Sequence, residues 1–502
     1  MRVLFLLCLA LAVSAPAAAR DWLRAETPRF VIYSDGYPME LERWARKVEN
    51  FDALLKAQFG GNDHAPGSKL TIYLLKDEKA VARLARRKNL TGFYSASSKG
   101  SFAVASRRPG YYKNRLSGQM TLFHEYAHHF MYRHFTSAYP VWYREGFAEY
   151  VSTATFGADW RSSFGLPAVP RLKYLRKEPL PIETILTASV EDFKPNKRAR
   201  FYAWSWKLVH MLHSRADRRP QLQRYLMLFA AGIRPRQAAA RAFGDLDRLE
   251  SELRAYSPPD KATSRSSAPR RQQAKIPVVA LDEVESELVD LQLARKVHDG
   301  PNRTLEAIRT LASNHPGNPE IQLELGFAEQ AASIDTGDQD FVLARSAAQR
   351  AITLAPRNAR AMALWADLET RRLKRDPAAR RTDWAAVRRK LMIAIRLDRA
   401  DPLALMTYYR TFVNEPRRPS TFAHNAMQRA FDIQPESVEI RLSHVYSLSI
   451  QGRFSEARKL ARILASDPHA ANLGRKALAS ITRIETAARQ DAAKQTSAAP
   501  KH

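Results

Sequence analysis

The segment LFHEYAHHFM, residues 122–131, constrains the fold of this chain more than any other feature. His124 and His128 are four residues apart, so in an α-helix both imidazoles project from one face, with Glu125 beside it. This is the H-E-x-x-H arrangement, in which two neutral imidazoles hold a Zn²⁺ ion and the glutamate acts on a water bound to the metal. A core helix with hydrogen-bonded histidines would show the same spacing, so the assignment also requires a helix and a third ligand.

The sequence predicts both the helix that carries the motif and the third ligand. Residues 116–135 contain no proline and carry apolar residues on nearly every side, which is typical of a buried helix. Pro140 suits the first turn of a second helix, where its missing N–H costs nothing. The path from His128 to the end of the first helix is roughly 10 Å, and that from Pro140 to Glu145 is roughly 8 Å. An antiparallel helix pair therefore brings Glu145 level with His128 as the third zinc ligand.

Glu149 lies one helical turn beyond Glu145, where it is expected to accept a hydrogen bond from a ligating histidine and so orient it. Three protein ligands leave the fourth zinc position for water, as a catalytic site needs. A closed structural site would need a fourth ligand, usually cysteine, and the only cysteine is Cys8. The alternative for the two glutamates is a solvated acidic face, although their surroundings, VWYREGFAEYV, are mostly apolar.

HEYAH followed by WYREGFAEY, with Glu145 17 residues after His128, resembles the gluzincin metallopeptidases. More narrowly, the chain resembles bacterial proteins in which a peptidase-MA-like domain precedes tetratricopeptide repeats. TPRFVIYSDG, RFYAWSWKLVHML and FGDLDRLESELRAY fit that family too. The resemblance implies an α+β zincin-like domain over residues 20–256, with a small mixed sheet and active-site helices.

The family also supplies a tyrosine or histidine downstream of the glutamate ligand to stabilise an oxyanion, and Tyr202 stands in that order. The alternative is that Tyr202 and Trp206, four residues apart, only pack together. His210 is a weaker candidate, expected to be a core or surface histidine. His129 points about 100° away from His128 and is not expected to share its metal.

Alternation and helical spacing predict a β-α-β-α-β-β order before the zinc helix. Residues 29–34 and 69–75 are predicted strands, residues 39–59 and the segment after Leu75 are predicted helices, and residues 92–106 are a predicted hairpin. Because gluzincins bind substrate backbone along an edge strand, the resemblance makes Ser101–Ser106 a candidate edge. The alternative is an ordinary hairpin strand.

The second half of the chain is predicted to be an all-α, tetratricopeptide-like solenoid over residues 281–488. Five segments share an amphipathic helix, a short turn with proline, and a second helix; the turn prolines are spaced by 40, 46, 33 and 33 residues. This is near the 34-residue tetratricopeptide period and predicts a concave protein-binding surface. The alternative is an irregular helical bundle. Residues 257–280 are a predicted linker, and residues 489–502 a predicted disordered tail.

Residues 1–19 have an arginine, an apolar run and A-x-A spacing at Ala17 and Ala19, which together predict a secretory signal peptide. We therefore expect export to the periplasm or medium of a bacterium. The alternative is an uncleaved membrane anchor, although the run is short and is interrupted by Ser14 and Pro16. No other apolar stretch is long enough for a span, so none is expected in the mature chain.

The formal charge of +29 favours anionic partners such as lipid headgroups or acidic envelope polymers. The arginines are spread along the chain, so an arginine-rich composition without a specific partner is the alternative. Nothing resembles a nucleic-acid-binding module with interleaved aromatic residues, and export argues against a genomic role.

These features together predict an exported peptidase with one zinc ion per chain. His124, His128 and Glu145 are the expected ligands, Glu125 the general base, and Tyr202 the candidate for the oxyanion. The substrate would be a protein or peptide, and the repeats would recruit it or a partner. The alternative function is a protein-interaction scaffold with an inactive or metal-stabilised zincin domain, but a purely structural zinc has no use for Glu125.

Overall fold

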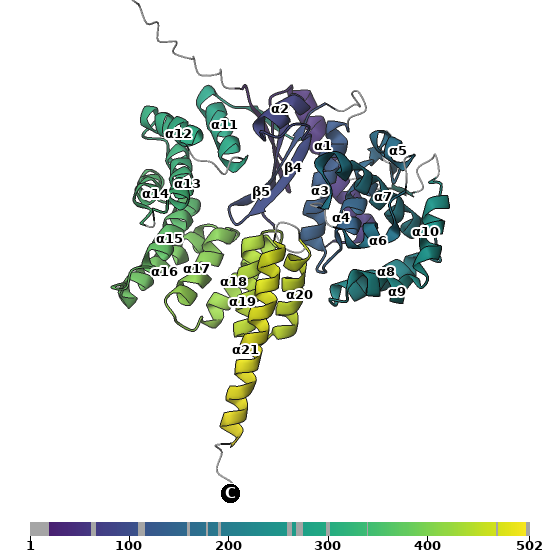
Figure 1. Cartoon of the computed structure of the whole chain (residues 1–502). Coiled ribbons are helices and arrows are strands. Elements are labelled where there is room, and N and C mark those ends of the chain that lie inside the picture. Colours follow the sequence, from purple (N-terminus) through teal and green to yellow (C-terminus); the bar gives the residue numbers. More distant parts are fainter. Residues whose placement is uncertain are drawn as a thin grey trace, which may run out of the picture.

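The computed structural model combines a small mixed sheet, the helices that pack on it, and an array of paired helices (Figure 1). The predicted signal peptide lies outside the described residues and stays a prediction. The structure describes residues 20–61, 67–108, 116–157, 161–176, 179–188, 192–258, 264–267, 275–297, 302–338, 340–467 and 470–497.

The main sheet has six strands in the order β4-β5-β3-β2-β1-β9. Its centre is parallel: β2 (Phe30–Ser34), β3 (Leu70–Leu75) and β5 (Gly100–Ser106). The antiparallel strands are β1 (Leu23–Glu26), β4 (Gly92–Ser97) and β9 (Val278–Ala280). With α1 (Pro38–Phe59) after β2 and α2 (Glu78–Leu84) after β3, the predicted β-α-β-α-β-β order is confirmed, and β1 precedes it as a further strand that was not predicted.

The candidate edge strand Ser101–Ser106 is wrong, because β5 lies between β3 and β4. All but the first residue of β5 are buried, which is typical of a strand covered on both faces. The edge strand next to β5 is β4. Its Ser95 and Ser97 are exposed, so one side of this strand tolerates water.

Residues 278–280, placed in the predicted linker, also belong to the sheet. They form β9, which pairs with β1 in the register Ala25↔Val278. Most of residues 259–274 lie outside the described residues; within them, β8 (Ser264–Ser267) pairs with β7 (Arg161–Phe164), which in turn pairs with β6 (Thr155–Phe156).

One face of the sheet packs on α1 and α3 (Gly118–His134). Ile32, Ile72 and Ala103 share a row across the strands and join the core of these two helices. Phe51 of α1 stacks on Phe123 of α3, with 4.0 Å between ring centroids. The helix α3 is therefore held rigidly under the sheet.

The opposite face of the sheet is covered by the first helix of the predicted solenoid, α11 (Glu283–Val297). Val289 and Leu293 of α11 join a buried cluster with Trp22, Tyr73 and Phe102 of the N-terminal part. The two predicted domains therefore share a hydrophobic core.

The remaining helices of the N-terminal part surround α3 (Figure 1). α4 pairs with α3 and with α7, and α8 to α10 close the far side. Their bounds are α4 (Val141–Ser152), α5 (Val169–Leu175), α6 (Ile182–Thr187), α7 (Pro195–Ser214), α8 (Arg219–Ala230), α9 (Pro235–Phe243) and α10 (Leu246–Ala255).

The C-terminal part is a curved array of antiparallel helix pairs, which confirms a helical repeat region. Its helices are α12 (Asn302–Asn314), α13 (Pro319–Thr336), α14 (Val342–Leu354), α15 (Ala359–Leu373), α16 (Arg381–Leu397), α17 (Pro402–Asn414), α18 (Thr421–Ile433), α19 (Val438–Ile450), α20 (Phe454–Ala465) and α21 (Ala471–Ser497). The predicted disordered tail is wrong for residues 489–497, which continue α21; residues 498–502 lie outside the described residues.

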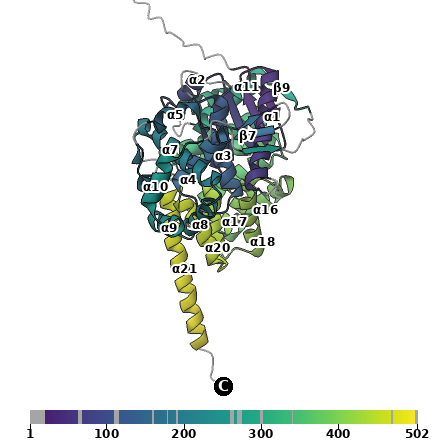
Figure 2. The same ribbon diagram turned by 90° about the vertical axis from the view of Figure 1, so that its right-hand side faces the viewer.

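The inner row of this array, α11, α13, α15, α17 and α19, curves round the β4–β5 hairpin (Figure 1). The last helix, α21, extends away from the rest of the molecule (Figure 2). Ser101 Oγ donates to Glu436 Oε1 at 3.0 Å, and Arg441 donates to the Tyr132 carbonyl of α3 at 3.1 Å. The concave surface expected to recruit a partner therefore contacts the chain's own hairpin. Among the helices in the described ranges, none combines the length and apolar character that a membrane span requires.

Candidate metal centre

Two helices of adjacent sequence position the predicted ligands. Ser117 caps α3 by accepting a hydrogen bond from the Met120 N–H at 3.1 Å. α3 ends at His134, and α4 begins after Pro140 and runs back beside it. A Cβ on Gly118 would lie 1.9 Å from the Ser106 carbonyl oxygen, so glycine lets the start of α3 lie against the end of β5. The predicted antiparallel helix pair is confirmed.

The three predicted ligands converge. His124 Nε2 and His128 Nε2 are 3.2 Å apart, and Glu145 Oε2 lies 3.5 Å from the first and 3.7 Å from the second. A tetrahedral ion with ligand distances near 2 Å separates its ligand atoms by about 3.3–3.4 Å. Two imidazole nitrogens and one carboxylate oxygen at this spacing fit a zinc ion.

Glu149 occupies the predicted supporting position. Its Oε1 lies 3.5 Å from His124 Nδ1, the ring nitrogen that faces away from the ligand triangle. Arg171 of α5 holds the carboxylate from the other side, with Nη2 2.6 Å from Oε1 and Nε 3.1 Å from Oε2. Although burial opposes ionisation, this guanidinium lowers the pKa of Glu149, so a fixed negative charge faces His124.

The ligands themselves interact strongly without metal. Burial opposes ionisation of Glu145, but His128, His124 and Arg144 outweigh it and lower its pKa to about 2. Burial also opposes protonation of His124, but the carboxylates of Glu145, Glu149 and Glu125 raise its pKa to about 9. Burial lowers the pKa of His128 to about 4. A protonated His124 can then donate to a neutral His128 across their 3.2 Å contact.

Glu125 lies beside the triangle and under the edge strand. Burial raises its pKa to about 7, with Glu145 and Glu149 adding to the rise, whereas His124 and a hydrogen bond from the Tyr94 backbone N–H oppose it. A carboxyl group with a pKa near neutrality can accept a proton and return it, which is what a general base requires. The bond to Tyr94 places Glu125 next to β4.

Tyr202 of α7 reaches the same site. Its ring centroid is 6.2 Å from that of His124, and the Arg171 guanidinium lies 5.4 Å over its ring. Burial raises the pKa of Tyr202 well above its usual value, so the hydroxyl stays protonated and can donate. Trp206 instead lies 5.3 Å from the ring of His210, so the structure brings Tyr202 to the predicted ligands.

The other two histidines lie where the sequence placed them. His210 is buried, and its Nδ1 is 2.6 Å from the Tyr256 hydroxyl, which makes it a core histidine. His129 turns away from the ligands: its Nδ1 is 3.0 Å from the Tyr94 hydroxyl and 3.9 Å from Glu436 Oε1.

Several supporting residues were missed by sequence reasoning. Arg171 lies in residues 157–198, where lysine, arginine and proline give no periodic signal, so its partner could not be inferred. Tyr94 and Glu436 meet His129 from a predicted strand and from a repeat turn, and only the packing of the two parts shows it. No local pattern marks these contacts, because they join residues 22 or more positions apart.

A scan against protein-family models finds no match, and a search of curated proteins finds none either. Among solved structures, parts of the chain are similar to tetratricopeptide proteins. TTC0263, a thermophilic TPR protein in Thermus thermophilus, is 15% identical with a TM-score of 0.33, covering 40% of this chain and 98% of that one. MamA from Desulfovibrio magneticus RS-1 is 13% identical with a TM-score of 0.26, covering 41% and 97%. Because these TM-scores are low, the assignment of a helical repeat region depends on the helix pairs of this chain alone.

Proposed function

We propose that the chain is a zinc-dependent peptidase that hydrolyses peptide bonds with activated water. The observation that carries the proposal is the triangle of His124 Nε2, His128 Nε2 and Glu145 Oε2, with Glu125 beside it. Among the described residues the set has three members, which is the number that a catalytic zinc takes from the protein. When bound, zinc would polarise the scissile carbonyl and lower the pKa of a water molecule.

Glu125 would accept the proton of the attacking water and pass it to the leaving amine. Its position next to the triangle and its pKa of about 7 suit both steps, since the group must be a base first and an acid afterwards. Tyr202, protonated and close to His124, would donate to the oxyanion that develops on the carbonyl oxygen.

The edge strand β4 would hold the substrate backbone. Its Tyr94 N–H already reaches the Glu125 carboxylate, so a peptide paired with the free edge of β4 would run past the general base. Strand addition recognises backbone rather than side chains and so suits a protein or peptide substrate. Export through residues 1–19 is part of this proposal and puts the substrate in the periplasm or outside the cell.

The test compares three variants of the zinc-loaded chain on an unstructured protein such as casein. Glu125→Gln should keep about one zinc ion per chain and lose about 10²–10⁴-fold in hydrolysis, because the ligands stay and the base is removed. His128→Ala should lose the zinc as well. Glu183→Gln, an exposed glutamate of α6, is the matched control and should keep both properties. Full activity in Glu125→Gln would refute the proposal.

A second function, a protein-interaction scaffold, is favoured by the array of helix pairs. The hairpin already lies against the concave surface, so a partner would need the outer helices or the rest of that surface. Wild-type protein that binds no zinc would favour this function over the peptidase.

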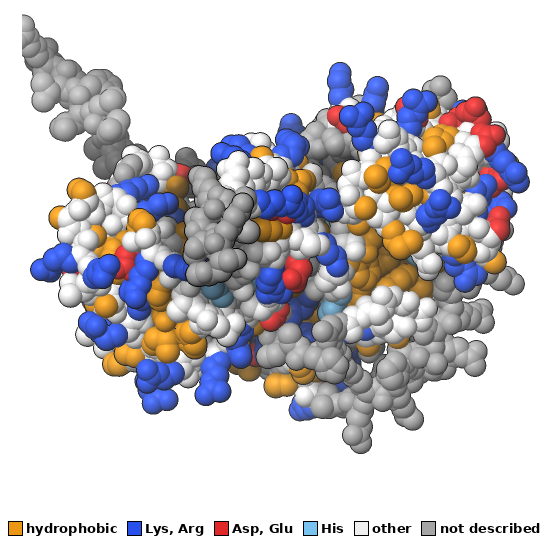
Figure 3. All heavy atoms as spheres, turned by 90° about the horizontal axis from the view of Figure 1, so that it is seen from below, with side chains coloured by type: hydrophobic (Ala, Val, Ile, Leu, Met, Phe, Trp, Pro, Cys, Tyr) orange, Lys and Arg blue, Asp and Glu red, His pale blue; other side chains and the backbone are white. Residues whose placement is uncertain are grey.

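The basic composition does not gather into one patch on the face seen from below, where lysine and arginine are interspersed with other side chains (Figure 3). We infer that any contact of this face with an anionic envelope surface is diffuse, and that it weakens steeply with salt.

A further inference from the structure

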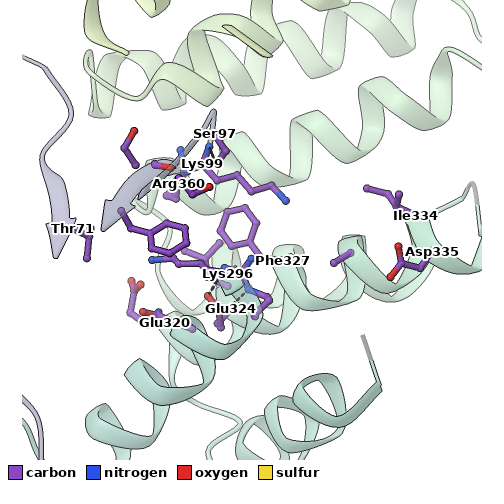
Figure 4. Close-up of a pocket in the computed structure, with 18 residues that line it drawn as sticks. Thr71, Ser97, Lys99, Lys296, Glu320, Glu324, Phe327, Ile334, Asp335 and Arg360 are labelled. Atoms are coloured by element: carbon purple, nitrogen blue, oxygen red, sulfur yellow. Dashed lines mark hydrogen bonds and ion pairs between the residues drawn. The ribbon is translucent and has the colours of Figure 1, made fainter. Parts of the chain in front are cut away.

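A cavity lies away from the metal centre, between the tip of the β4–β5 hairpin and the inner helices α11, α13 and α15 (Figure 4). We call it the hairpin-tip cavity; its volume is about 540 Å³. Ser95 and Ser97 of β4 line this cavity. The side chain of Tyr94, the residue before Ser95, points instead to His129 of α3. Because side chains alternate along a strand, the cavity is on the opposite face of the sheet from the ligands.

Four basic side chains line the hairpin-tip cavity, and two of them already have carboxylate partners. Arg295 of α11 forms an ion pair with Glu324, and Arg360 of α15 lies 2.9 Å from Asp401 Oδ1. These two guanidinium groups are therefore compensated by the protein itself.

The other two, Lys99 and Lys296, form no ion pair among the described residues. Lys296 Nζ donates to the Tyr73 hydroxyl at 3.0 Å, and Lys99 Nζ lies 5.2 Å from the centre of the Phe327 ring. Among the described residues, no carboxylate lies within ion-pair distance of either ammonium group. Burial, with repulsion from Arg295, lowers the pKa of both lysines to about 8, although Asp367 and Glu439 oppose the shift at Lys99 and Glu324 opposes it at Lys296.

The acidic residues of the lining form no ion pair with Lys99 or Lys296. Glu324 is engaged by Arg295, and Glu320 accepts a hydrogen bond from the Asn358 side chain at 3.1 Å. Asp335 lies beside Ile334, at the far end of the cavity from Thr71 (Figure 4). The part of the cavity near the hairpin therefore holds two ammonium groups without an ion pair, with which an anion could pair.

The same part of the cavity offers an apolar surface. Phe327 lies under Lys99, Arg295 and Arg360, each within 5.2–5.6 Å of its ring centre. Ser97 and Ser101 of the hairpin also line the cavity, but their hydroxyls already donate to the Gly100 carbonyl and to Glu436. A volume of about 540 Å³ suits a small molecule rather than a folded partner.

We propose that the hairpin-tip cavity binds a small organic dianion whose charged groups pair with Lys99 and Lys296 and whose apolar part packs on Phe327. The shared chemistry is that of an organic phosphate or a dicarboxylate. Such a ligand would join the hairpin, through Lys99, to the repeat region, through Lys296. The proposal does not depend on the peptidase, because no ligand of the metal centre lines this cavity.

The test titrates the zinc-loaded full chain with two probes, phenyl phosphate and phthalate, by isothermal calorimetry. Benzyl alcohol is the neutral control. At least one dianion should bind once per chain, and the tighter of the two identifies the class. Lys99→Met and Lys296→Met should each weaken that binding about tenfold or more, because each removes a charge-assisted contact. Lys99→Arg keeps the charge and should retain most of the affinity.

Lys390→Met is the matched control, since Lys390 also lies over an aromatic ring, that of Trp365, but outside the cavity. It should bind the probe like the wild type. The proposal is overturned if neither dianion binds at millimolar concentration, or if the double variant Lys99→Met/Lys296→Met binds as tightly as wild type. The second outcome would place the anion elsewhere, for instance on the zinc ion.

Discussion

At the scale of single residues, the metal centre depends on a chain of charges that ends at Arg171. The guanidinium holds Glu149, and Glu149 faces the outer nitrogen of His124. Supporting contacts of this kind fix the orientation of a ligating imidazole and raise its basicity, and their loss costs about 10–100-fold in metal affinity.

Arg171→Met should therefore weaken zinc binding about 10–100-fold without removing a ligand. Competition with a chromophoric zinc chelator measures the affinity. Arg176→Met, an exposed position at the end of the same helix, is the control and should bind zinc like the wild type. Unchanged affinity in Arg171→Met would show that Glu149 keeps its position without the guanidinium.

His444 is a residue-scale feature of a different kind. It is buried in α19 and stacks on Phe431, with 4.8 Å between ring centroids. Burial lowers its pKa to about 4, helped by Arg453 and opposed by Glu456. Because the folded pKa lies below the ordinary value of about 6.5, the unfolded chain takes up the proton first. The contribution of neutral, buried His444 to the free energy of unfolding is therefore complete above pH 6.5 and is lost as the pH falls towards 4.

The unfolding free energy of the full chain should thus decrease between pH 7 and pH 5. In His444→Gln, that decrease should be smaller, because one histidine that must be neutral in the folded state is gone. Denaturant unfolding at the two pH values measures both differences. An identical decrease in wild type and variant would mean that His444 is protonated without cost.

At the scale of helices, the site depends on how closely α4 approaches α7. Gly146, next to Glu145, is where the two helices meet: a Cβ there would lie 2.5 Å from the Ser205 carbonyl oxygen and 2.7 Å from Val209 Cγ2. α4 carries a ligand and α7 carries Tyr202, so this contact sets the distance between them.

Gly146→Ala should destabilise the chain by about 1–3 kcal/mol, because the helices must separate to admit the methyl group. It should also reduce hydrolysis more than zinc content, since Tyr202 moves relative to ligands that stay together on α3 and α4. Gly317→Ala, where nothing lies within 4 Å of the added Cβ, is the control and should change stability little. A stable, fully active Gly146→Ala variant would show that the contact is loose.

At the scale of the whole molecule, the sheet-containing part and the repeats form one structure. β9 extends the sheet beyond residue 256, and α11 covers one face of it. Arg133 of α3 donates a hydrogen bond to the Ile433 carbonyl at the end of α18. Removing α11 would expose the apolar cluster around Trp22 and Tyr73, at about 1.5–3 kcal/mol for each large side chain.

A chain of residues 20–256 should therefore be less stable than one of residues 20–297, and both less stable than the full chain. Thermal unfolding at equal concentration ranks the three. If residues 20–256 unfold at the temperature of the full chain, the repeats are a separate domain and the shared core contributes nothing.

Much of the site could be predicted from the sequence, because its geometry is local. Helical periodicity places His124, His128 and Glu125 together, and the short connection to α4 returns Glu145 to them. The order of strands and helices along the chain and the helix pairs follow from equally short patterns. These features depend on residues close in sequence, so the tertiary environment could not change them.

The rest was decided by packing between distant segments. Four features join segments far apart. They are the position of β5 between β3 and β4, the addition of β9, the contact of Arg171 with Glu149, and the hairpin inside the curve of the repeats. Periodicity tells which face of an element is apolar, but not which of several apolar or charged surfaces will cover it. That choice depends on the shapes of complete surfaces, and they exist only once the chain has folded.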